Sequence, residues 1–156
     1  MTDMDRDGLS RAISSAIASA PDADSAMKQT VELLKDGMPA YTWVGIYLME
    51  GDDELVLGPY RGKPSPHIRI SLGSGICGAA ATQKATIVVD DVNADPRYLA
   101  CSLETKSEIV VPIMDGSRVL GEIDIDSDHQ AAFTAEDQAL LEAVAAQLAP
   151  RMQESR

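Results

Sequence analysis

The spacing of apolar residues changes near residue 40, and this change constrains the fold most. Before it, apolar residues recur every three or four positions, in the stripe typical of amphipathic helices. The residues of this stripe are Leu9, Ile13, Ile17, Met27, Val31 and Leu34. From Tyr41 onward, short segments rich in β-branched and aromatic residues are separated by turn formers, as in strands. The pattern predicts a helical N-terminal region, residues 6–37, followed by a core, residues 41–150.

Helix-breaking and capping residues refine this division. Pro21 ends the first apolar stripe, and Asp22 or Asp24 can cap a second helix. That helix is expected to end near Gly37. Residues 134–137 (TAED) form a capping box at the start of a C-terminal helix. The apolar positions of that helix are Leu140, Leu141, Val144 and Leu148.

The strand patterns follow one another as hairpins. The expected strands are residues 42–49, 54–57, 67–72, 86–89, 108–114 and 119–126. Residues 115–117 (DGS) are a hairpin-turn signal between the last two. Consecutive hairpins indicate an α+β domain, with a mostly antiparallel central sheet of about six strands flanked by N-terminal and C-terminal helices. The 156 residues are enough for one domain, which we expect to span residues 1–156.

The charge balance excludes several classes of partner. The chain has 25 acidic and 13 basic residues, for a formal net charge of −12. A nucleic-acid or anionic-membrane binder needs a basic face, so neither partner is expected. The sequence has no run of about 18 apolar residues that could span a membrane, and its acidic start does not resemble a secretory signal. We therefore expect a cytoplasmic location.

The sequence contains two cysteines, Cys77 and Cys101. In a reducing compartment each is a small core residue or a reactive thiol, rather than half of a structural disulfide. Cys101 lies in a long segment of turn formers, residues 90–106, and loops of this length are usually functional. Cys77 precedes a predicted short helix, whose N-terminus could lower the thiol pKa, although simple packing is the more economical interpretation.

No metal or cofactor site is predicted. His67 and His129 are far apart in the sequence, and closed zinc sites usually have tightly spaced ligand pairs. The glycines of residues 73–78 (GSGICG) lack the Gly-Lys-Ser/Thr ending of a phosphate-binding loop.

Acidic residues alternate along the last predicted strand. Glu122, Asp124 and Asp126 share one face, because successive side chains of a strand point to opposite sides. Neighbouring carboxylates repel each other, so they lie either on a solvated outer face or in a pocket for a cationic group. Glu108, at the start of the adjacent strand, either joins that pocket or remains an exposed charge.

Two aromatic residues share a face of the first predicted strand. Trp43 and Tyr47 are four positions apart, so both point to the same side. They are either core residues or the wall of a ligand pocket, where tryptophan would suit the methyl group of a thioether or sulfoxide.

Several segments form a recognisable set in fixed order. They are residues 43–47 (WVGIY), 57–63 (LGPYRGK), 73–78 (GSGICG), Cys101 with 107–112 (SEIVVP), and 124–127 (DIDS) with 133–134 (FT). Together they resemble the GAF-domain family of free methionine-R-sulfoxide reductases, over about positions 10–148. The resemblance implies a homodimer that reduces free methionine sulfoxide, with thioredoxin or another thiol reductant as electron donor and no cofactor.

The resemblance also implies residue roles. Cys101 matches the catalytic cysteine, which attacks the sulfoxide sulfur and becomes a sulfenic acid as methionine leaves. The family's pocket contains carboxylates that hold the substrate ammonium group and assist protonation of the sulfoxide oxygen. These carboxylates match Glu108, Asp124 and Asp126. The aromatic wall of the pocket matches Trp43 and Tyr47.

One position departs from the family. Many members have a resolving cysteine before the glycine turn, whereas the matching residues 63–70 (KPSPHIRI) contain none. Cys77 is then the only candidate to resolve Cys101, and a disulfide requires their Cα atoms to come within about 4.4–6.8 Å. Three outcomes stay open: Cys77 resolves the sulfenic acid after loop movement, an external thiol attacks it, or the domain is a non-catalytic module that binds a small ligand or senses oxidants.

Overall fold

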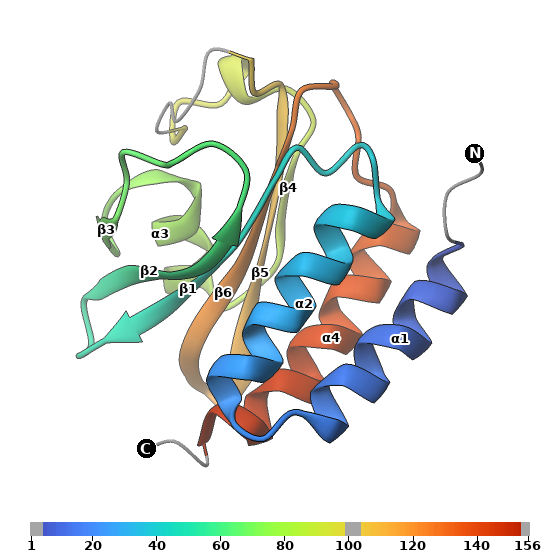
Figure 1. The fold of residues 1–156 in the computed structure, drawn as a ribbon. Helices are drawn as coiled ribbons and strands as arrows, with labels where there is room; N and C mark the ends of the chain where they lie inside the picture. The colour runs from blue at the N-terminus through green and yellow to red at the C-terminus, as the bar shows by residue number, and fades with distance from the viewer. Residues whose placement is uncertain (1–4, 99–103, 154–156) are drawn as a thin grey trace.

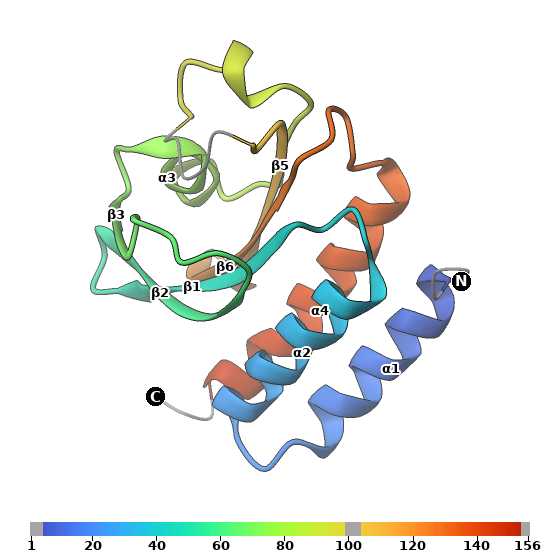
Figure 2. The same ribbon diagram turned by 45° about the horizontal axis from the view of Figure 1, so that its top comes forward.

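The protein folds into a six-stranded sheet with helices on both faces. The computed structural model describes residues 5–98 and 104–153, so Cys101 lies outside the described residues. Helices α2 and α4 pack on one face of the sheet, α1 packs against these two helices, and α3 lies on the other face of the sheet (Figures 1 and 2). The helices are α1 (Arg6–Ser19), α2 (Ala23–Gly37), α3 (Gly75–Gln83) and α4 (Ala135–Gln153), with a short 3₁₀ helix, η1 (Val92–Ala94).

All neighbouring strands in the sheet are antiparallel. Their order is β3-β2-β1-β6-β5-β4. The strands are β1 (Trp43–Glu50), β2 (Glu54–Arg61), β3 (Arg69–Ser71), β4 (Ile87–Val89), β5 (Ser107–Asp115) and β6 (Arg118–Ser127). The predicted α+β architecture and its antiparallel sheet are confirmed, with β3 shorter than the sequence pattern indicated.

Side-chain caps fix where two helices begin. The carboxylate of Asp22 accepts a hydrogen bond from the Ser25 N–H at 2.8 Å, so Asp22, and not Asp24, caps α2. At α4 the Thr134 N–H donates to Asp137 Oδ2 at 2.7 Å, and the Asp137 N–H donates back to Thr134 Oγ1 at 3.4 Å. These reciprocal bonds satisfy N–H groups that the helix itself leaves unpaired, and they confirm the predicted capping box.

Strand alternation separates two layers of side chains. Ile123 and Ile125 of β6 belong to the apolar core between the sheet and helices α1, α2 and α4. The acidic residues that alternate with them, Glu122, Asp124 and Asp126, face α3, where a second buried layer includes Trp43, Tyr47 and Cys77. No described helix combines the length and apolar character needed to cross a membrane. The arrangement places the predicted site residues of β1, β5 and β6 on the α3 side of the sheet.

Candidate active site

Four carboxyl groups from β5 and β6 lie together on the α3 side of the sheet. This acidic cluster consists of Glu108, Glu122, Asp124 and Asp126. Their exposed fractions are 6%, 0%, 4% and 5%, because α3 covers this face. Glu108 pairs with Asp126 in the register of β5 and β6, which brings the two strands' acids side by side. Of the two alternatives, the solvated outer face is therefore wrong, and the pocket remains.

Cys77 joins this cluster from α3. The helix begins at Gly75, whose φ of +72° suits a glycine, and Cys77 lies in its first turn with 4% exposure. The Cys77 thiol donates to Asp124 Oδ2 at 3.4 Å. One ligand atom each of Cys77, Glu108 and Asp124 lies within 4.8 Å of the others, and among the described residues these three form a group that could hold a metal ion.

The cluster holds its protons more tightly than exposed acids do. Burial, followed by the charge of Asp124, raises the pKa of Glu122 and of Asp126 well above their usual values. Burial also raises the pKa of Asp124. Burial and the nearby carboxylates raise the pKa of the Cys77 thiol well above 9.0, so the alternative in which the helix N-terminus lowers this pKa is wrong, and the favoured interpretation of Cys77 as a packed residue agrees with its burial. Desolvation outweighs the helix dipole here.

Several oxygens of the cluster have no hydrogen-bond partner among the described residues. They are both side-chain oxygens of Glu122, Asp124 Oδ1 and Asp126 Oδ1. A buried polar atom without a partner costs about 1–3 kcal/mol, so native proteins seldom leave several together. The arrangement is suited to a ligand that brings hydrogen-bond donors, such as an ammonium group.

The two predicted aromatic residues differ in their contacts. Trp43 Nε1 donates to the carbonyl oxygen of Lys63 at 2.9 Å, and the Tyr47 hydroxyl donates to that of His67 at 2.8 Å. The ring of Trp43 lies close over Gly45, where an added Cβ would be 2.3 Å from a ring atom. Trp43 and Tyr47 thus hold the segment after β2 against the sheet.

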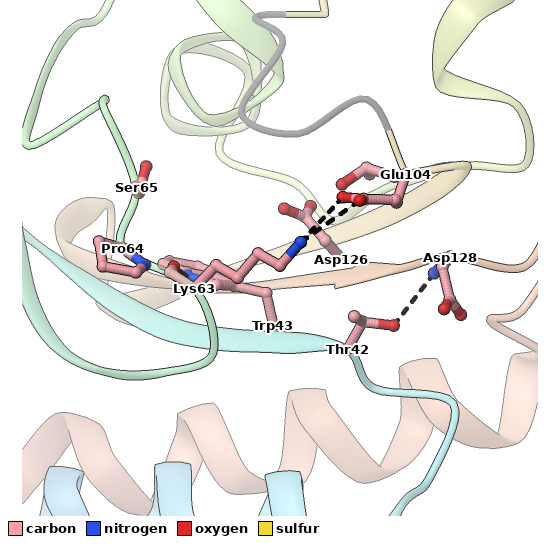
Figure 3. Close-up of a pocket in the computed structure, with 9 residues that line it drawn as sticks. Thr42, Trp43, Lys63, Pro64, Ser65, Glu104, Asp126 and Asp128 are labelled. Atoms are coloured by element: carbon pink, nitrogen blue, oxygen red, sulfur yellow. Dashed lines mark hydrogen bonds and ion pairs between the residues drawn. The ribbon is translucent and has the colours of Figure 1, made fainter.

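A cavity of about 320 Å³ opens beside Trp43 and Asp126. Its described lining residues are Thr42, Trp43, Lys63, Pro64, Ser65, Glu104, Thr105, Asp126 and Asp128 (Figure 3). Lys63 Nζ lies 3.3 Å from both carboxylate oxygens of Glu104, and Figure 3 shows this contact next to Asp126. Trp43 and Asp126 are the predicted site residues that line the cavity. Tyr47 and the other described ones are buried and are not part of its lining.

Three residues of this region were not among the predicted site residues. Glu122 shares the acidic face by strand alternation, so its position was foreseeable, but its burial was not. Lys63 ends the motif of residues 57–63, yet its side chain gave no sign of facing a cavity. Glu104 lies in a loop, three residues after Cys101, where no periodic pattern indicates direction.

Comparisons with known proteins place the chain in a family. The GAF domain family matches residues 22–152. GAF domain-containing protein A of Dictyostelium discoideum is 42% identical over 101 residues, 65% of this chain, and the chain spans only 63% of that protein's length. The free methionine-R-sulfoxide reductase of Escherichia coli is 38% identical over 122 residues, 78% of this chain and 73% of that protein.

A solved structure agrees over the whole chain. The free methionine-R-sulfoxide reductase of Neisseria meningitidis, in complex with its substrate, superposes with a TM-score of 0.93 at 36% identity. The match covers 100% of this chain and 95% of that one. With this fold, this acidic site and these relatives, the chain belongs to the GAF-domain family and, within it, to the family of free methionine-R-sulfoxide reductases.

Proposed function

We propose that this protein reduces free L-methionine-R-sulfoxide to methionine by thiol chemistry. The observation that carries the proposal is the buried acidic cluster, with unpartnered oxygens, beside a cavity lined by Trp43. A cation-accepting site next to a flat apolar ring is complementary to a zwitterion with a sulfoxide side chain. The sulfoxide reductases among the relatives described above support the same reaction.

Cys101 is the proposed nucleophile. Its thiolate attacks the sulfoxide sulfur, and the sulfoxide oxygen takes up a proton and passes to Cys101. Methionine then leaves, and Cys101 remains as a sulfenic acid. The assignment rests on the position of Cys101 in the family motif. Glu104 and Thr105, the first described residues after it, line the cavity.

The acidic cluster is proposed to supply both charge and protons. Glu108, Asp124 and Asp126 accept hydrogen bonds from the substrate ammonium group, which contributes the donors that Asp124 Oδ1 and Asp126 Oδ1 lack among the described residues. Because burial raises the pKa values of Asp124 and Asp126, these carboxyls hold protons more tightly than exposed acids do, and one of them can deliver a proton to the sulfoxide oxygen. Trp43 supports the methyl end of the substrate, and Tyr47 positions the segment that carries Lys63.

The sulfenic acid must then be reduced. A thiol condenses with it to form a disulfide and water, and a dithiol such as thioredoxin reduces that disulfide. We propose Cys77 as the resolving thiol, since it is the only other cysteine and contacts Asp124 of the cluster. Its raised pKa makes this step slow until the thiol leaves its buried position.

Turnover tests the proposal directly. The purified protein, supplied with thioredoxin, thioredoxin reductase and NADPH, is expected to consume NADPH when free L-methionine-R-sulfoxide is added. The Cys101→Ser variant serves as the matched control, because it keeps the acidic cluster and removes only the nucleophile. NADPH consumption no faster than that of this variant would reject the reductase.

A second candidate function is a GAF module that binds a small ligand without turnover. The absence of cysteine in residues 63–70 favours it, since no thiol replaces the usual resolving residue there. It predicts at most one methionine released per chain. Release of many equivalents would exclude it.

We also propose that residues 1–156 act as a single GAF domain, as a homodimer and in the cytoplasm. The match of the GAF domain family to residues 22–152 supports the domain limits. Light scattering of the purified protein would distinguish a dimer from a monomer.

A further inference from the structure

We infer that Lys63 binds the α-carboxylate of the substrate, and that Glu104 occupies this position when no substrate is bound. The inference rests on the proposed function for the identity of the ligand, a free amino acid with a sulfoxide side chain. It deepens that proposal by naming the residue that recognises a carboxylate. The acidic cluster recognises only the ammonium group of such a ligand.

The cavity presents the three chemical groups that complement a free amino acid. Trp43 is apolar and Asp126 is acidic, and both line the cavity. Lys63 is the only cationic side chain among the described lining residues. A zwitterion whose ammonium group binds the acidic cluster leaves an anionic carboxylate, and an ammonium side chain is its natural partner.

The backbone of Lys63 is held in place, whereas its exposed side chain can change its ionic partner. Its carbonyl oxygen accepts the hydrogen bond of Trp43 Nε1 at 2.9 Å. Gly62, with a φ of +126°, packs so closely that an added Cβ would lie 2.7 Å from the Trp43 ring. The Lys63 side chain, in contrast, is 78% exposed. The lysine is thus anchored beside the aromatic wall, while its amine can move from one carboxylate to another.

Glu104 resembles the carboxylate that Lys63 would bind in a substrate. Lys63 Nζ lies 3.3 Å from both of its oxygens, as it would from a bound carboxylate (Figure 3). Both side chains are exposed, and exposed ion pairs contribute little to stability. A substrate carboxylate can therefore replace Glu104 at small cost.

This arrangement gives a physical basis for selecting free amino acids. A methionine sulfoxide residue inside a peptide has neither a charged ammonium nor a charged carboxylate group. It therefore lacks the partner for Lys63 as well as the partner for the acidic cluster.

Calorimetric titration with two ligands tests the role of Lys63. The ligands are L-methionine-R-sulfoxide and its carboxamide, at a mildly acidic pH where both keep the ammonium charge. We expect the wild-type protein to bind the acid about 10- to 100-fold more tightly than the amide, the range of a charge-assisted hydrogen bond. In the Lys63→Met variant, the ratio of the affinity for the acid to the affinity for the amide is expected to fall to near one.

A matched control is available on α2. Lys28 is an exposed lysine in an ion pair with Asp24 at 3.2 Å, away from the cavity, so Lys28→Met should keep the wild-type ratio. A wild-type ratio near one, a ratio unchanged in Lys63→Met, or no binding of either ligand would each overturn the inference.

Glu104→Gln tests the second half of the inference. Removing the competing carboxylate should tighten binding of the acid by up to about fivefold, with Asp24→Asn as the control. Weaker binding would mean that Glu104 clamps the ligand, which contradicts its role as a placeholder.

The turnover assay separates this inference from the proposed reaction. Turnover by the wild type with an unchanged ratio in Lys63→Met would reject the role of Lys63 alone. The expected ratios without turnover would reject only the reductase.

Discussion

The surroundings of Cys77 oppose the chemistry proposed for it. A resolving thiol reacts as the thiolate, yet burial and the charges of Asp124 and Glu122 raise the pKa of Cys77. The same carboxyls are needed to bind an ammonium group and to deliver a proton. An acidic site and a reactive resident thiol are therefore in conflict, unless Cys77 leaves the cluster before it reacts.

Gly45 is the residue whose replacement should disturb the aromatic wall most directly. A Cβ at Gly45 would lie 2.3 Å from the Trp43 ring, so Gly45→Ala must displace that ring. We expect KM for methionine sulfoxide to rise about tenfold or more, because small displacements of a positioning group have large effects. Trp43 is the only tryptophan, so its fluorescence should change as well.

The control for this prediction is Gly73→Ala. Among the described residues, a Cβ at Gly73 would have no neighbour closer than Ser71 Oγ at 4.0 Å, so KM and fluorescence should stay unchanged. An unaltered tryptophan spectrum in Gly45→Ala would contradict the placement of the ring.

At the scale of elements, one buried carboxylate joins α1, β1 and α4. Asp137 of α4 accepts hydrogen bonds from Arg6 at 3.2 Å and from the hydroxyl of Tyr41, which precedes β1, at 2.5 Å. Burial alone would raise its pKa, but the bonds from Tyr41, the Thr134 N–H and Arg6 outweigh burial and lower it. The helical layer is thus tied to the sheet by a charge that must stay ionised.

We expect Asp137→Asn to lower the free energy of unfolding by about 1–3 kcal/mol at neutral pH. A carboxyl whose folded pKa is depressed stabilises the fold above its unfolded pKa, and this contribution is lost as pH falls through the folded pKa. The difference between variant and wild type should therefore shrink below about pH 3.8. Urea unfolding at several pH values measures it. A pH-independent difference would contradict the ionised state of Asp137.

The sequence predicted elements better than it predicted their surroundings. Period and capping located the helices and the hairpins, because these signals are local in the chain. Alternation also assigned Glu122, Asp124 and Asp126 to one face. Whether that face meets water depends on α3, which the chain reaches only through β2 and β3, so burial was not predictable locally. The ion pair of Lys63 with Glu104 joins two loops 41 residues apart, beyond the reach of any periodic pattern.

At the scale of the whole molecule, the two faces of the sheet have different compositions. The side toward α1, α2 and α4 is an apolar layer, which supplies the burial that stabilises a domain of this size. The side toward α3 contains the acidic cluster and its unpartnered oxygens. The molecule can retain costly polar groups on one face because the other face is apolar. This separation follows from strand alternation, which sends neighbouring residues of β6 to opposite layers.

The acidic cluster should therefore limit the stability of the unliganded protein. Burial raises the folded pKa of Glu122 well above 4.5, so its stabilising contribution is present below the unfolded pKa and is lost as pH rises toward the folded value. Glu122→Gln removes this ionisation. We expect the variant to be more stable than the wild type by about 1 kcal/mol or more near pH 8, with a smaller difference near pH 4.5.

Urea unfolding across this range measures the effect, with the exposed Glu32→Gln as the control. A constant difference between Glu122→Gln and wild type at all pH values would mean that Glu122 ionises in the fold as freely as in the unfolded chain.

The same linkage between protonation and stability extends to ligand binding. A ligand ammonium group favours the ionised carboxylates, so methionine sulfoxide should release protons from the wild-type cluster when it binds. Because Glu122→Gln has one fewer such acid, fewer protons should be released, as calorimetry in buffers of different ionisation enthalpy would measure.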